Sequence, residues 1–215
     1  MRRLLPCVLL IALSACASPD DAPEDAPEDS APPSEASAPS PAEPMSTTDL
    51  TVAASVAALP EEFRASASVH ERTDGAGLVE LRSGEGPYIC LADDPADDRF
   101  HVACYHESLE PFMARGRALR AEGRTSDVDS VRFAEVEAGT LPMPSHPAAL
   151  YSLSGDSVSV DESTGAVTGA RPLYVVYIAY ATAETTGLPT TPTADGPWLM
   201  FPGTPKAHIM FTSQM

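Results

Sequence analysis

Cys16 stands in a sequence context that predicts a specific chemical modification. It ends the run Leu13-Ser14-Ala15-Cys16, which has the form of a bacterial lipobox, and it follows two arginines and an apolar stretch over residues 4–13. That stretch is too short to span a bilayer, which needs about 20 apolar residues, so it is typical of a cleaved signal peptide. We expect residues 1–15 to be removed and Cys16 to carry lipid. The alternative is an ordinary signal peptide with a chance cysteine.

Cys90 and Cys104 are the two cysteines that remain when Cys7 is removed with the signal peptide and Cys16 is acylated. Compartments outside the bacterial cytoplasm permit disulfides, so we expect these two to be bonded to each other. The alternative is a zinc site that adds His101 and His106, but structural zinc sites usually show two tightly spaced ligand pairs. We therefore predict no metal site here.

His208 is the first candidate for a functional side chain. It lies between Ala207 and Ile209, beside a turn with two prolines, although a lone histidine in a strand is more often structural than catalytic. The four carboxylates in residues 93–98 resemble a calcium loop, but neither their spacing nor a glycine matches an EF-hand, so we interpret them as a solvated loop. Phosphate-loop, dinucleotide-binding, nucleophile-elbow and zinc-helix motifs are absent from the sequence, and no cofactor is predicted.

The acidity of the chain excludes some partners. Without the signal peptide the chain has 11 basic and 31 acidic residues, a formal charge of −20. Such a chain repels phosphate backbones and anionic headgroups, so nucleic acid is not an expected partner and membrane contact should come through the lipid on Cys16. Ala17 is not the aspartate that retains lipoproteins in the inner membrane of enteric bacteria, so the outer membrane of the cell envelope is the expected location.

The composition divides the chain into three parts. After the signal peptide, residues 17–47 contain eight acidic and no basic residues among Pro, Ala and Ser, which predicts a disordered tether over 16–47. Residues 48–215 have the length of one globular domain.

Helical spacing of apolar residues predicts helices over residues 48–59 and 108–121. Arg115, Arg117 and Arg120 lie toward the end of the second helix, where they suit the helix dipole, and we interpret them as a solvated face. Strand patterns outnumber helices, so the expected fold is α+β on a mainly antiparallel sheet. The run over 173–182 is apolar on both faces and predicts a central strand covered on both sides. The other expected strands span 67–70, 78–82, 88–91, 130–137, 149–153, 157–160, 166–169, 198–201 and 207–212.

Two segments carry a resemblance. The stretch from Gly196 to Met210 resembles the ending of a group of small exported bacterial proteins of uncharacterised function, which share a Gly-Thr-Pro-aromatic-Ala-His-Ile-Met pattern. The stretch from Gly86 to Pro95, with Cys104, resembles an upstream segment of the same group. Lys206 replaces the usual aromatic residue. The resemblance implies a shared fold and export, and no mechanism.

Two hypotheses for function remain after these exclusions. The first is a lipid-anchored binding or structural module of the bacterial cell envelope that contacts an unknown envelope protein or ligand. The second is a hydrolase or metal-dependent enzyme that uses His208 with an unidentified carboxylate.

We predict that Cys16 is the N-terminal residue of the mature protein and carries lipid. The intact mass of the protein from its native membrane should equal that of residues 16–215 plus the lipid. A Cys16→Ser variant should lose the lipid mass. A mature chain that starts elsewhere, or that is unmodified at Cys16, would contradict the prediction.

Overall fold

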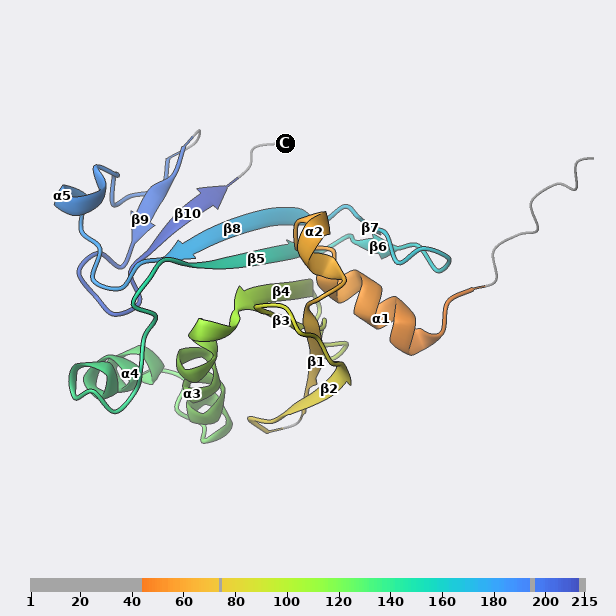
Figure 1. Ribbon diagram of the computed structural model, residues 1–215, viewed down its shortest axis with the longest axis horizontal. Helices are drawn as coiled ribbons and strands as arrows, with labels where there is room; N and C mark the ends of the chain where they lie inside the picture. The colour runs from red at the N-terminus through yellow and green to blue at the C-terminus, as the bar shows by residue number, and fades with distance from the viewer. Residues whose placement is uncertain (1–43, 74, 194–195, 213–215) are drawn as a thin grey trace, which may run out of the picture. The chain divides into compact units, whose positions relative to one another are not determined.

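The computed structural model describes residues 44–73, 75–193 and 196–212. The predicted signal peptide, Cys16 and the part of the tether up to residue 43 lie outside these residues. The described chain confirms the α+β class: an eight-stranded, mainly antiparallel sheet carries a few helices (Figure 1). Among the described residues, no helix is both long and apolar enough to cross a membrane.

The strand order in the sheet is β2-β1-β3-β4-β5-β8-β10-β9. All neighbours are antiparallel except β1 and β3, which are parallel. A separate hairpin pairs β6 with β7. The strands are β1 (Ser68–Arg72), β2 (Leu78–Arg82), β3 (Tyr88–Leu91), β4 (Phe100–His106), β5 (Ala148–Gly155), β6 (Ser159–Val160), β7 (Val167–Thr168), β8 (Arg171–Tyr177), β9 (Trp198–Met200) and β10 (His208–Thr212).

Helices lie on both faces of the sheet. Helix α1 (Thr47–Val56) packs mainly against β1–β4. On the other side, the β1–β2 end of the sheet curls toward helix α3 (Glu110–Ala121) (Figure 1). The side chain of Ser46 caps the first helix by accepting from the backbone N–H of Asp49, so this helix already includes Thr47, which we had placed in the tether. The helices are α1 (Thr47–Val56), α2 (Glu61–Arg64), the 3-10 turn η1 (Glu107–Leu109), α3 (Glu110–Ala121), α4 (Val128–Glu137) and α5 (Ala183–Thr186).

Strand β4 divides the core in two, because successive side chains of a strand point to opposite faces. Val102 and Cys104 join the cluster under α1, whereas Tyr105 joins the cluster on the α3 face. Strand β4 is not among the strands expected from the sequence. Phe100, Val102 and Tyr105 favour a strand, but four successive residues are buried, so the alternation of apolar and polar residues is missing.

The strand predicted over residues 130–137 is wrong, because α4 occupies this segment. Its valines and phenylalanine suggested a strand. The buried residues, however, are Val128 and Arg132, four apart on one helical face, and Glu135 pairs with Arg115 of α3 at 2.7 Å. Contacts with α3 therefore outweigh the local propensity.

The prediction for residues 173–182 is correct in position and wrong in extent. β8 lies between β5 and β10, as a central strand should. Val175 and Tyr177 are buried, but Tyr174 on the opposite face is 41 % exposed. The strand ends at Tyr177, and the chain then turns through Tyr180, whose φ is +62°.

Cys90 and Cys104 form the expected disulfide. They lie directly opposite each other in the antiparallel β3–β4 pair, both fully buried, and the sulfur of Cys104 lies 3.4 Å from the Ser55 carbonyl oxygen of α1. The bond thus joins the two strands at the centre of the cluster under α1.

Replacing both cysteines by alanine should lower the free energy of unfolding by about 3 kcal/mol, because the bond closes a loop of about 15 residues. Urea denaturation of the oxidised protein and of the Cys90→Ala/Cys104→Ala variant would measure the difference. Equal midpoints, or two titratable thiols in unreduced protein, would contradict the prediction.

Candidate functional site

His208, the candidate from the sequence, is a buried residue of β10 that lies opposite Tyr177 of β8 and Met200 of β9. Its Nδ1 lies 2.7 Å from the carbonyl oxygen of Lys206, so Nδ1 carries the proton and donates. Burial lowers the pKa of His208 below its ordinary value, and the hydrogen bond to Lys206 opposes this only in part. The imidazole is therefore neutral at pH 7.

Two aromatic rings lie close to this imidazole. The Tyr177 ring lies 4.8 Å from it and the Phe201 ring 5.8 Å, centre to centre. Phe201 has a φ of +53°, which is uncommon for a bulky residue, and the ammonium of Lys206 lies 4.4 Å from the centre of its ring. Lys206 thus contacts an aromatic ring.

Asp129 of α4 connects this C-terminal segment to the helices. Its carboxylate accepts from Lys206 at 2.8 Å and also pairs with the buried Arg132. Arg132 lies 3.9 Å above the Phe112 ring of α3 and donates to the Phe112 carbonyl oxygen at 3.1 Å. The residues around His208 therefore hold β10, α4 and α3 together. No described carboxylate hydrogen-bonds the imidazole, as a catalytic partner would.

The other sequence candidates are separated in the structure. His106 contacts Ser108 at 2.8 Å, whereas His101 points to the α3 face, away from the disulfide. In the acidic loop, Asp93 accepts from the His101 backbone N–H at 2.6 Å, and Asp94 from that of Ala96 at 3.0 Å. Within the described ranges, no three His, Cys, Asp or Glu side chains are placed to hold a metal ion together.

A cleft of about 620 Å³ lies on the α3 face, between the curled β1–β2 hairpin and α3. We call it the arginine cleft. Its apolar lining comes from Leu91, Ala103 and Leu150 of the sheet and Met113 of α3. Its polar side chains are those of Arg72, Asp97, His101, Tyr105, Arg117 and Arg120.

The cations of this cleft come from distant parts of the chain. Arg72 ends β1, whereas Arg117 and Arg120 lie one turn apart on α3. Arg72 and Arg120 use one guanidinium nitrogen each for a backbone carbonyl, at 3.0 and 3.1 Å, and form no ion pair with any described residue. Both are exposed, so the remaining N–H groups can meet a ligand.

Arg117 is held inside the cleft by Tyr105 and Glu110. It donates to the Tyr105 hydroxyl oxygen at 3.2 Å and to the Glu110 carboxylate at 2.5 Å, while the tyrosine hydroxyl donates to Glu110 at 2.5 Å. Burial and the neighbouring carboxylate raise the pKa of Tyr105, so it remains a neutral donor. The Arg117 Nε is buried without a hydrogen-bond partner.

The sequence interpretation of these arginines as one solvated face is therefore incomplete. Arg115 pairs with Glu135 of α4, Arg117 packs into the cleft, and only Arg120 fits that description. The spacing of 117 and 120 indicated a shared helical side. Nothing in the sequence indicated that Arg72, some 45 residues earlier, lines the same cleft.

Comparisons with known proteins add no relatives: no protein family, no curated protein and no solved structure matches this chain.

We predict that His208 reduces stability at acid pH. Because its pKa is lower in the folded than in the unfolded chain, the unfolded state binds more protons below about pH 6.5, and stability falls as the pH drops. Each unit of lowering contributes at most about 1.4 kcal/mol.

A His208→Asn variant keeps a donor for the Lys206 carbonyl but cannot titrate. Between pH 7.5 and 5 its free energy of unfolding should fall by less than that of the unmodified protein. The loss of ring packing lowers the stability of the variant by the same amount at every pH. Urea denaturation across this pH range measures the free energy of unfolding of both proteins. Parallel pH profiles would contradict the assignment.

Proposed function

We propose that this protein is a lipid-tethered binding module of the bacterial cell envelope, and that its ligand is a small amphipathic anion held in the arginine cleft. The ligand combines an apolar body with a carboxylate or phosphate group. The observation that carries the proposal is the meeting of three arginines from two separate elements over an apolar floor.

The charge distribution supports an anionic ligand. Of the 11 basic residues after the signal peptide, three line this one cleft. Arg117 is paired with Glu110, whereas Arg72 and Arg120 form no ion pair with a described residue and face a single lining carboxylate at Asp97. In a chain of strongly negative net charge such a grouping creates a local positive potential that attracts anions. Planar guanidinium groups also match carboxylate and phosphate oxygens in geometry.

The shape and floor of the cleft support an apolar body on the ligand. A volume of about 620 Å³ lies within the range of small-molecule sites, which are mostly apolar with a few placed polar groups. Leu91 and Ala103 belong to a strand pair that the disulfide joins on the opposite face, so the floor is rigid before a ligand arrives. A preformed floor lowers the ordering cost of binding.

The lipid on Cys16 and the tether over residues 16–47 are part of this proposal. The lipobox run supports an anchor at the outer membrane, and the proline-rich acidic composition supports an extended spacer. A spacer of this kind would let a binding domain reach ligands at a distance from the bilayer. The enzyme hypothesis for His208 has less support, since its imidazole is buried beside two aromatic rings and has no described carboxylate partner.

The test uses octanoate as the probe and the chain from residue 16 carrying Cys16→Ser, so that the protein stays unlipidated. Octanoate should shift the backbone amide resonances of the cleft residues, and n-octanol, which lacks the charge, should bind more weakly. Arg120→Gln should weaken octanoate binding about two- to fivefold, as expected for a partly exposed ion pair, and added salt should weaken it further.

Arg171→Gln is the matched control, because Arg171 is exposed, loses the same charge and does not line the cleft. It should leave octanoate affinity unchanged. Equal binding of octanoate and octanol, or equal effects of the two substitutions, would reject the anion site.

A further inference from the structure

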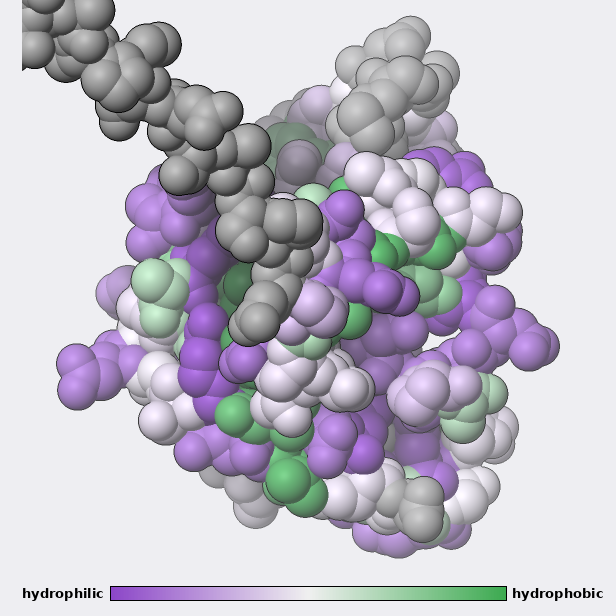
Figure 2. All heavy atoms as spheres, turned by 90° about the vertical axis from the view of Figure 1, so that its right-hand side faces the viewer, coloured by the Kyte–Doolittle hydropathy of each residue, from purple (hydrophilic) through white to green (hydrophobic). Residues whose placement is uncertain are grey.

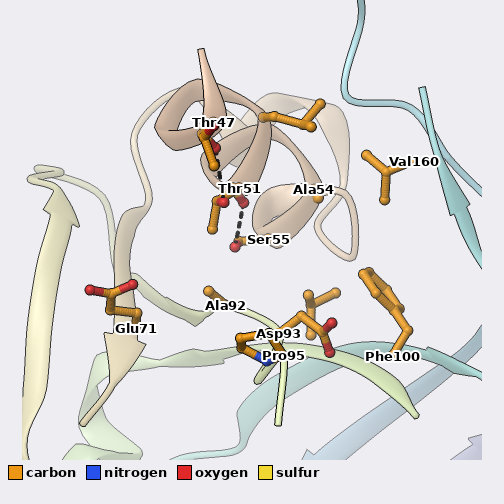
Figure 3. A pocket seen from close by; sticks show the side chains of 12 residues that line it. Thr47, Thr51, Ala54, Ser55, Glu71, Ala92, Asp93, Pro95, Phe100 and Val160 are labelled. Atoms are coloured by element: carbon orange, nitrogen blue, oxygen red, sulfur yellow. Dashed lines mark hydrogen bonds between the residues drawn. The ribbon is translucent and has the colours of Figure 1, made fainter. Parts of the chain in front are cut away.

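A second pocket, of about 370 Å³, lies on the opposite side of the same sheet (Figure 3). Helix α1 forms its roof, with Ala54 pointing inward, and the ring of Phe100 and the side chain of Val160 close one side. Its volume falls at the lower end of the range for small-molecule sites. From outside, the face that carries α1 is mostly hydrophilic, with scattered apolar patches (Figure 2).

Two of the three hydroxyl groups that line this pocket, those of Thr51 and Ser55, hydrogen-bond to the backbone of α1. The Thr51 hydroxyl donates to the Thr47 carbonyl oxygen at 3.0 Å, and the Ser55 hydroxyl to that of Thr51 at 2.7 Å (Figure 3). Two carboxylates, those of Glu71 and Asp93, are the charged groups of the lining. The pocket therefore offers a ligand an apolar wall and negative charge.

Each of these carboxylates has at least one oxygen atom that accepts no hydrogen bond from a described residue. Glu71 makes no hydrogen bond or ion pair with any described residue, and Asp93 uses Oδ1 for the His101 backbone N–H, which leaves Oδ2. The alternation of side chains along β1 explains why this pocket is negative and the arginine cleft is positive. Glu71 and Arg72 are neighbours on β1, so Glu71 faces this pocket and Arg72 faces the arginine cleft.

We propose that this pocket binds a small apolar ligand that carries a single ammonium group. Charge complementarity selects the ammonium: the carboxylates of Glu71 and Asp93, which lie on different sides of the pocket (Figure 3), give the lining a negative charge that attracts it. The exposed part of the Phe100 ring can contact the methylene groups beside the ammonium. The apolar body of the ligand packs against Ala54 and Val160. This site is independent of the arginine cleft and does not rest on the function proposed above.

Octylammonium is the probe, titrated into the chain from residue 16 carrying Cys16→Ser. The amide resonances of α1 and of residues 92–95 and 100–102 should shift, and those of the arginine cleft on α3 should not. Neutral n-octanol should bind more weakly and octanoate should not bind here. Glu71→Gln should weaken octylammonium binding about two- to fivefold, and the double variant with Asp93→Asn should weaken it further.

Glu80→Gln is the matched control, since Glu80 is an exposed residue of β2 that does not line the pocket. It removes the same charge and should leave the affinity unchanged. Thr51→Phe should fill the pocket and abolish binding of both octylammonium and octanol, with urea denaturation to show that the domain stays folded. Shifts outside the pocket, equal affinity for octanol, or equal effects of Glu71→Gln and Glu80→Gln would each overturn the proposal. Octanoate binding in the arginine cleft can succeed or fail separately.

Discussion

The register between β3 and β4 is the constraint on which the rest of this structure depends. Cys90 faces Cys104 across the pair, and this alignment sets the face to which each remaining residue of β4 points. A slip by one residue would exchange the side chains that β4 buries on its two faces, because side chains alternate with a period of two. The disulfide fixes the alignment covalently, so the floor of the arginine cleft and that of the α1 pocket are defined by the same two strands.

Ionic contacts of arginine provide the second level of organisation. Arg115 joins α3 to α4, and Arg132 lies buried between them with a carboxylate at one side and an aromatic ring below. The planar guanidinium suits such positions better than an ammonium, because it stacks on rings and donates in several directions at once. The Nε atoms of Arg117 and Arg132 are nevertheless buried without partners, which costs stability. Paired or stacked arginines therefore hold α3 and α4 together.

Local patterns in the sequence predicted much of the fold. The class, the disulfide and the second long helix follow from composition, cysteine count and helical spacing, which depend on residues close in sequence. The wrong predictions concern segments whose structure is determined by contacts with residues distant in the sequence. Segment 130–137 is helical because it packs on α3, and Tyr174 is exposed because α1 packs mainly on other strands. The arginine cleft joins Arg72 to a helix some 45 residues later, and only the sheet topology reveals that neighbourhood.

The position of β10 within the sheet has a consequence for how the chain completes its fold. Residues His208–Thr212 follow both β8 and β9 in the sequence, yet they are inserted between these two strands. Pairing across this part of the sheet must therefore wait until β10 has been synthesised. Until then β8 presents an open edge, and β9, made earlier, has no neighbour. Such unpaired edges are templates for pairing with other chains, so this order of events favours an escort that shields the nascent protein until β10 is in place.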